Sequence, residues 1–141
     1  MPTLKERILD IVKEPCLAAL ATITEDGKPW VRYVIIEASD DLTFRCSTFA
    51  WGRKIPQIES NSEVHLTCGV TFKSDKGPYL QIQGRAEYTK DREARHAFWS
   101  DRLSVVFEGP DDPRFGVITV RADRIEVWMI GVPEYEVWER E

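Results

Sequence analysis

The sequence has few cysteines and histidines, and neither residue type is arranged for chemistry. Its 141 residues include only Cys16, Cys46, Cys68, His65 and His96 from these two types. The cysteines are far apart, form no C-x-x-C pair and lie in apolar runs, which favours reduced, buried thiols over a catalytic or metal role. His65 and Cys68 lie three apart on a predicted strand and so point to opposite faces. We therefore expect no metal site.

The sequence also lacks a long apolar run and an excess of positive charge. No stretch approaches the roughly 20 apolar residues of a membrane span, and the N-terminus has no apolar signal-peptide core, so we expect a cytoplasmic protein without a membrane partner. Nineteen Lys and Arg against 24 Asp and Glu give a net charge of −5. We expect no nucleic-acid partner, and any bound anion must meet a local basic site.

Three common catalytic signatures are missing as well. The sequence contains no G-x-S-x-G elbow, no P-loop and no G-x-G-x-x-G. Their absence removes the commonest hydrolase, NTPase and Rossmann interpretations. What remains is a chain of 43% apolar and 11% aromatic residues, enough for one globular domain over residues 1–141 with a sizeable core.

Alternating apolar and polar residues predict a mainly β fold. The predicted strands cover residues 16–24, 30–37, 42–47, 63–72, 79–88, 114–121 and 125–130. Short helices are predicted after a capping box at Thr3 and Glu6, near Arg53, and from Asp91 to about 103. Gly84 marks a bulge or a close backbone approach. A closed antiparallel β-barrel with short helices buries these alternating faces without open edges.

The most informative local feature is the basic doublet Arg53-Lys54. It follows Ser47 and Thr48 at a predicted strand-to-helix junction. Helix amides, two cations and two hydroxyl groups would together hold a phosphate. A solvated first helical turn is the alternative interpretation.

Arg32 is a third cation near this site in the predicted meander. It stands mid-strand between Val31 and Tyr33, on a run too apolar to leave it in bulk water. A partly buried arginine needs a partner. That partner is either a bound anion or a strand carboxylate such as Glu37 or Glu63.

Several segments, taken in order, carry a family resemblance. They are RYVII (32–36), the stretch 44–61 with STFAWGRKIPQIESN at its end, VHL (64–66) and IQGRAE (82–87). This order resembles the pyridoxamine 5′-phosphate oxidase-like FMN-binding split-barrel superfamily. The segment FEGPDDP (107–113), followed by ITV (118–120) and EVW (126–128), is similar to its general stress protein-like branch.

The resemblance implies a split β-barrel with Greek-key-like connections and an FMN cofactor. Its implied cofactor-binding residues are Arg32 and Lys54 on the phosphate, Arg53, Ser47 and Thr48 as nearby hydrogen-bonding groups, and Tyr33 and Val34 with backbone groups along the isoalloxazine ring. It also implies a homodimer with the cofactor at the subunit interface. Trp99 and Trp128 are candidates for the contribution from the partner chain, or else packing residues.

Two departures from the family pattern bear on function. Gly52 stands where a serine is common, which removes a hydroxyl group from the phosphate site. Glu37 stands where the oxidase has a substrate-binding lysine, which argues against pyridoxamine phosphate as the substrate. We expect a flavin-dependent oxidoreductase acting on an unidentified small molecule or redox partner, with no indispensable catalytic side chain. The alternatives are a flavin storage or sensor module without turnover, and a barrel that binds a deazaflavin coenzyme or haem.

Overall fold

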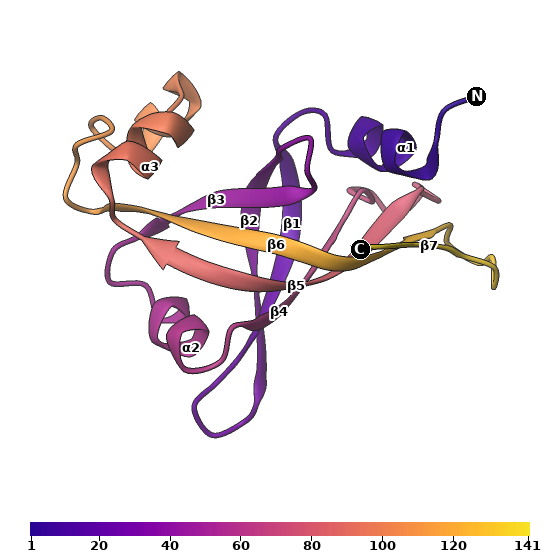
Figure 1. Ribbon diagram of the computed structural model, residues 1–141, viewed down its shortest axis with the longest axis horizontal. Coiled ribbons are helices and arrows are strands. Elements are labelled where there is room, and N and C mark those ends of the chain that lie inside the picture. Colours follow the sequence, from indigo (N-terminus) through magenta and orange to yellow (C-terminus); the bar gives the residue numbers. More distant parts are fainter.

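A long, strongly bent β-sheet forms the body of the molecule, as the computed structural model of residues 1–141 shows (Figure 1). The strands are β1 (Cys16–Ile23), β2 (Pro29–Ala38), β3 (Thr43–Phe49), β4 (Glu63–Cys68), β5 (Tyr79–Thr89), β6 (Phe115–Trp128) and β7 (Glu136–Glu139). The helices are α1 (Leu4–Ile11), α2 (Lys54–Ser60), α3 (Arg92–Phe98) and the 3-10 helix η1 (Asp101–Val105).

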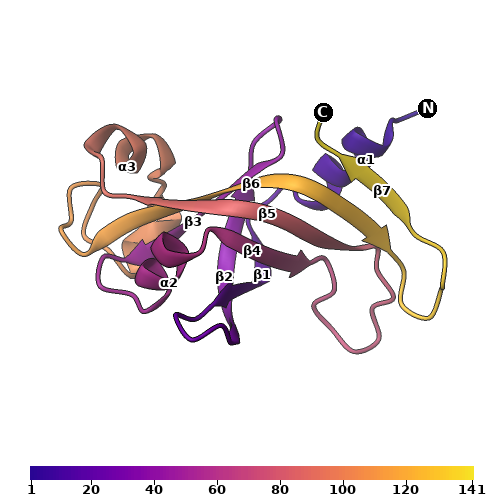
Figure 2. The same ribbon diagram turned by 60° about the horizontal axis from the view of Figure 1, so that its bottom comes forward.

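Six of the strands close into an antiparallel barrel. The sheet order is β3-β2-β1-β4-β5-β6-β7, and a further pairing of β3 with β6 closes the ring, leaving β7 as an extension on β6. The chain runs β1-β2-β3, crosses through α2 and returns with β4 beside β1, which is a Greek-key connection. Figure 2 shows α3 at one end of the long strands β5 and β6, and α1 with β7 at the other. The predicted fold class is confirmed.

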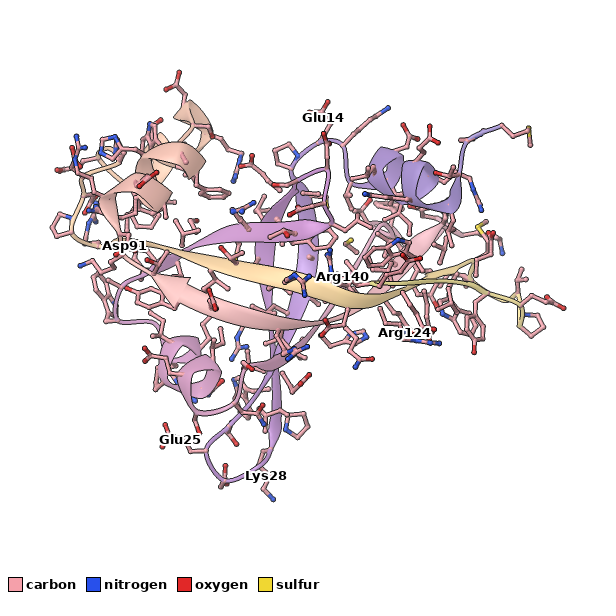
Figure 3. The ribbon with its side chains drawn as sticks, viewed as in Figure 1. Glu14, Glu25, Lys28, Asp91, Arg124 and Arg140 are labelled. Carbon is pink, nitrogen blue, oxygen red and sulfur yellow. The ribbon has the colours of Figure 1, made fainter.

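Local sequence signals explain where several elements begin and turn. Thr3 and Glu6 form the predicted capping box at the start of α1. The turn between β1 and β2 contains Gly27, whose φ of 82° suits glycine. Glu25 and Lys28 lie at the tip of this hairpin, away from the body of the barrel (Figure 3).

Two apolar cores stabilise the structure. The larger contains 19 buried residues, among them Leu20, Phe44 and Ile82 inside the barrel and Ile8 from α1. The smaller contains Phe98, Leu103, Phe107, Phe115 and Val117, under α3 and η1. The second core fixes η1 against β3 and β6, where it forms one wall of the cleft described below.

The predicted strand 63–72 is too long. β4 ends at Cys68 because Gly69 adopts a φ of 112°. A Cβ at Gly69 would lie 2.7 Å from the carbonyl oxygen of Pro78. Phe72, which the alternation placed on the buried face, is 69% exposed.

Three further boundaries differ from prediction. The expected strands 114–121 and 125–130 are one strand, β6. The expected helix 91–103 is split at Trp99 and Ser100 into α3 and η1, and Asp91 occupies the N-cap position of α3 without a side-chain cap bond. β7 was not predicted, because its two apolar residues, Val137 and Trp138, are only half-buried and stand between glutamates.

Gly84 is confirmed as a bulge and a close approach. The register between β5 and β6 shifts between Gln83 and Gly84, so Gln83 lies opposite Arg124 while Gly84 lies opposite Ala122. A Cβ at Gly84 would stand 2.5 Å from the carbonyl oxygen of Arg121. Any side chain here would therefore force the two strands apart.

The barrel splits between β2 and β3. These strands pair only at Glu37 with Arg45 and Ala38 with Phe44, whereas β2 pairs with β1 from Pro29 to Ile36. Before Glu37, from Pro29 to Ile36, the edge of β2 that faces away from β1 has no strand partner. This opening positions the candidate site.

Candidate functional site

The open edge of β2 forms one side of a cleft of about 620 Å³. β3 and the start of α2 form the opposite side and one end, and η1 with the segment that follows forms a largely apolar wall. The lining residues are Pro15, Tyr33, Val34, Ile35, Ser47, Thr48, Phe49, Lys54, Arg102, Leu103, Val105, Val106 and Phe107. The cleft therefore joins an apolar wall to a cationic, hydroxyl-bearing end.

Arg32 is half-buried next to this end and has only neutral partners. Its guanidinium donates to the hydroxyl oxygen of Thr22 at 2.6 Å, to Oε1 of Gln57 at 3.1 Å and to the carbonyl oxygen of Leu20 at 3.3 Å. Burial first, and then the charge of Arg53, lower the pKa of Arg32 below its ordinary value. The alternative that Arg32 pairs with a strand carboxylate is wrong.

Lys54 and Arg53 complete a group of three cations without a carboxylate. The pKa of Lys54 is lowered by burial, which the nearby charge of Arg32 reinforces and Cys46 opposes. Arg53 is exposed, and its guanidinium carbon lies 5.6 Å from the centre of the Trp30 ring. None of the three forms an ion pair. The alternative interpretation was that Arg53 and Lys54 form a solvated first helical turn. This fits Arg53, which is exposed, but not Lys54, which is half-buried.

Thr48, Gly52 and Lys54 come together where β3 leads into α2. A Cβ built on Gly52 would lie 3.1 Å from the hydroxyl oxygen of Thr48 and 3.6 Å from Nζ of Lys54. The Thr48 hydroxyl donates to the neighbouring carbonyl of Phe49 at 3.2 Å. Ser47 lies on the opposite face of β3 from Thr48, and both line the cleft. α2 begins one residue after the predicted position, and its Ile55 amide already donates to Gly52.

Tyr33 and Val34 lie on the open edge of β2. Tyr33 is 76% exposed, Val34 is half-buried, and both line the cleft. Since β2 has no partner on this side before Glu37, backbone groups on this edge are free to bind a ligand. All seven predicted cofactor-binding residues thus lie in or beside the cleft, and none of them forms an ion pair.

Glu37 pairs with Arg102, not with Arg32. Its carboxylate accepts a hydrogen bond of 2.6 Å from Arg102 of η1, in an ion pair at the edge of the cleft. Trp99 packs edge-on against Phe115 at 5.7 Å in the second core, and Trp128 stacks on Tyr135 at 4.4 Å. Within one chain, both tryptophans have packing roles.

Two parts of the site were not predicted from the sequence. One is the pair of residues that bind the Arg32 guanidinium, and the other is the apolar wall that η1 forms. Gln57 accepts hydrogen bonds from both Thr22 and Arg32, which fixes the guanidinium against the barrel. Gln57 follows Lys54 by three residues, so it shares a helix face with it, and this spacing was the available signal. Thr22 comes from a distant strand and Arg102 from η1, and no local pattern connects either of them to Arg32 or to the cleft.

A continuous apolar face lies beside the cleft on the outside of β1 and β2. Leu17 pairs with Ile35, Ala19 with Tyr33 and Ala21 with Val31, so all six side chains share this outer face. We call these six residues the outer apolar face. Its largest members are exposed, Val31 at 63% and Tyr33 at 76%. Tyr33 and Ile35 also line the cleft, so the two features are contiguous.

Comparison with known proteins fits this architecture. Residues 4–129 match the protein family described as pyridoxamine 5′-phosphate oxidase. The chain belongs to this family. Members of the pyridoxamine 5′-phosphate oxidase family commonly bind flavin and are commonly dimers. The resemblance inferred from the sequence is confirmed.

Two curated relatives and one solved structure show where the chain lies in this family. It is 28% identical to general stress protein 26 of Bacillus subtilis (strain 168), over 91% of this chain and 90% of that protein. It is 31% identical to a pyridoxine/pyridoxamine 5′-phosphate oxidase of Rubrobacter xylanophilus, over 82% of this chain and 66% of that enzyme. The crystal structure of general stress protein 26 from Bacillus anthracis str. Sterne superposes with a TM-score of 0.77 at 26% identity, covering 94% of this chain and 97% of that one.

More distant structures share the fold alone. An F420 reductase superposes with a TM-score of 0.68 at 21% identity, covering 89% of this chain and 98% of that one. A haem-binding protein from Mycobacterium smegmatis superposes with a TM-score of 0.75 at 18% identity, covering 99% of this chain and 59% of that one. No helix of the present structure is both long and apolar enough to cross a membrane.

Proposed function

We propose that this protein binds FMN in the cleft between β2 and β3 and is a flavin-dependent oxidoreductase. The observation that carries the proposal is the group of three cations, Arg32, Arg53 and Lys54, which has no carboxylate partner. Buried or half-buried cations are costly without an anion, and a phosphate dianion supplies the missing charge. A cleft of this size and apolar character suits a cofactor ring system.

Each part of the site takes one part of the cofactor. Arg32 and Lys54 bind the phosphate, with Arg53 and the hydroxyl groups of Ser47 and Thr48 as further donors. The free backbone edge at Tyr33 and Val34 runs along the ring. The apolar wall of η1 excludes water from the far side. When bound, the flavin supplies the redox chemistry, and the protein sets its orientation and access.

Glu37 and Arg102 bear on the substrate. Pairing with Glu37 neutralises Arg102, so this edge of the cleft presents no free cation to a second phosphate. We therefore do not assign pyridoxamine 5′-phosphate as the substrate. The substrate is an unidentified small molecule or redox partner that reaches the ring.

We further propose a homodimer that meets through the outer apolar face and places the cofactor at the subunit interface. Six apolar side chains on two paired strands form a flat surface of the kind that a second copy covers. Because Tyr33 and Ile35 belong both to this face and to the cleft, the second copy would border the cofactor. The three free thiols fit the reducing cytoplasm that the sequence predicts.

The alternatives make different use of the same barrel. A storage or sensor module would bind FMN without turnover. A deazaflavin coenzyme also presents a phosphate group to the cations. Haem fits poorly, because His65 and His96 do not line the cleft and His96 already pairs with Asp111 at 2.7 Å.

The first test is a visible absorption spectrum of the purified protein, followed by mass analysis of the molecule released on denaturation. Bound or added FMN with a flavin spectrum supports the proposal, whereas release of haem or of a deazaflavin overturns the cofactor assignment. Anaerobic reduction of the FMN complex by NADH or NADPH, and reoxidation by added acceptors, then separates an oxidoreductase from a storage module. A complex that no donor reduces would contradict the enzymatic part.

A further inference from the structure

Cys16 and Cys68 are 52 positions apart in the sequence, but the barrel makes them neighbours. Cys16 is the first residue of β1 and Cys68 the last of β4. In the antiparallel register Ala18 lies opposite Cys68, so Cys16 is the diagonal neighbour of Cys68 on the same, inward face. Both are free thiols, Cys68 buried and Cys16 partly exposed.

The two thiols differ in a way that suits a stepwise reaction. A hydrogen bond from Cys68 lowers the pKa of Cys16. The same bond, followed by burial, raises the pKa of Cys68. Cys16 is therefore both the more accessible thiol and the one more readily deprotonated. Cys46, the third thiol, is buried, and burial raises its pKa to about 11.

We propose that Cys16 and Cys68 form a reversible intrachain disulfide when the chain meets a low-molecular-weight disulfide such as oxidised glutathione. The Cys16 thiolate attacks one sulfur of the small disulfide, whose S–S bond breaks and releases one thiolate. The Cys68 thiol then loses its proton to solvent, and its sulfur displaces the second small thiolate from Cys16. Two protein thiols are oxidised to one disulfide, and the small disulfide is reduced to two thiols.

The positions of the cysteines at strand ends make the bond geometrically accessible. Diagonal neighbours in a sheet have Cα atoms about 7–8 Å apart, slightly more than the roughly 4.4–6.8 Å that a disulfide spans. Both strands end here, with Pro15 before Cys16 and Gly69 at a φ of 112° after Cys68. Cys16 and Cys68 stand in the last pair of their ladders, with Ile36 and Leu80, so a closer approach would disturb only terminal pairs.

Neither thiol lines the candidate cofactor cleft. Cys16 and Cys68 lie on the inward-facing side of β1 and β4, opposite the outer apolar face. Cys68 also borders a small hollow of about 370 Å³ that Leu17, Ala19 and Tyr33 of the outer apolar face line. The proposed bond therefore ties together β1 and β4 directly behind the outer apolar face, and its formation does not depend on flavin binding.

The test is oxidation of the full-length folded protein in glutathione buffers of graded ratio. After acid quenching and denaturation, free thiols are alkylated and the protein is analysed by intact mass and peptide mapping. Wild-type protein, with three cysteines, should lose alkylation at Cys16 and Cys68 together and yield one cross-linked peptide pair, while Cys46 remains alkylated. Added dithiothreitol should restore all three thiols.

Matched variants separate the proposed roles. Cys46→Ser should form the same cross-link as wild type. Cys68→Ser should stop at a glutathione adduct on Cys16, and Cys16→Ser should leave Cys68 unmodified. A persistent glutathione adduct on Cys16 of the wild type overturns the proposal. So does a folded protein that keeps all three thiols under conditions that oxidise the unfolded chain.

Discussion

At the scale of single residues, Gly52 is the position where the proposed phosphate site lacks a hydroxyl group that a serine would supply. A serine there needs no left-handed backbone, and its Cβ would be close to the Thr48 hydroxyl and 3.6 Å from Lys54 Nζ. We predict that Gly52→Ser binds FMN about fivefold more tightly, because one added hydrogen bond contributes about 1 kcal/mol. Isothermal titration with FMN measures this.

Gly52→Ala is the matched control for that prediction, because it introduces the same Cβ without the hydroxyl group. The new Cβ would lie 3.1 Å from Thr48 Oγ1 and 3.2 Å from the Phe49 carbonyl oxygen, so both variants require the same small local shift. Equal affinities of the serine and alanine variants would show that the hydroxyl does not reach the cofactor.

The partly buried charge of Lys54 should lower the stability of the cofactor-free protein. Its pKa is lowered in the folded state, so the unfolded chain binds more protons and the free energy of unfolding rises as pH rises through the folded-state pKa. We predict that Lys54→Met melts at a higher temperature than wild type near neutral pH without cofactor, and that the difference shrinks toward pH of about 10. Thermal denaturation across pH measures this, and a variant that is less stable at every pH would contradict it.

Sequence reasoning located the cations but not the groups that hold them. Arg32, Arg53 and Lys54 were recognisable because a charge in an apolar run and a basic doublet at a junction are local signals. The partners of Arg32 were not recognisable in the same way. Thr22 and Gln57 meet it only after β1 pairs with β2 and α2 packs on the barrel.

At the scale of elements, the split between β2 and β3 makes a prediction for hydrogen exchange. Amides of β2 that face away from β1 before Glu37 have no strand partner, so they should exchange rapidly in the free protein. Adjacent amides point to opposite edges of a strand, so one of Tyr33 and Val34 has its N–H on the open edge, and FMN binding should slow exchange of that amide by at least about tenfold. NMR-detected exchange resolves these amides, with the β5–β6 ladder as the internal reference. Unchanged exchange on β2 with bound FMN would contradict the assigned ring position.

The errors in the boundaries of β4 and β6 both come from a local backbone feature that the apolar-polar pattern does not reveal. In β6, Asp123 is the extra residue opposite the Gln83/Gly84 step, so Ala122 and Ile125 both point inward although three positions separate them. The alternation of inward and outward residues therefore shifts by one position at Asp123, and the single strand β6 looks like two strands in the sequence. At the end of β4, Gly69 turns the chain while the alternating pattern continues to Phe72.

At the scale of the whole molecule, the outer apolar face carries the prediction about assembly. We predict that Val31→Glu converts a dimer into a monomer, because a carboxylate would be buried without a partner within the proposed interface. Sedimentation equilibrium measures the change. Phe72→Glu is the control, since Phe72 is 69% exposed and lies outside this face. A Val31→Glu protein that remains dimeric would place the interface elsewhere.

The overall architecture was the most predictable level. Period-two segments joined by short connections favour a closed antiparallel barrel whatever the exact strand ends. The small, apolar or β-branched residues from Cys16 to Thr24 predicted a strand, and β1 covers Cys16–Ile23. The sequence could not show how far the outer apolar surface extends, because that depends on the pairing of β1 with β2.

The most direct test of the central claim compares FMN with riboflavin, which lacks the phosphate group. The account predicts that wild-type protein binds FMN at least about tenfold more tightly than riboflavin, since each charge-assisted hydrogen bond contributes about 1.5–3 kcal/mol. Lys54→Glu should abolish this preference while leaving riboflavin binding nearly unchanged. Lys28→Glu, at the exposed tip of the β1–β2 hairpin, should preserve it. Equal affinities of the wild type for FMN and riboflavin would contradict the assignment of the three cations to the cofactor phosphate.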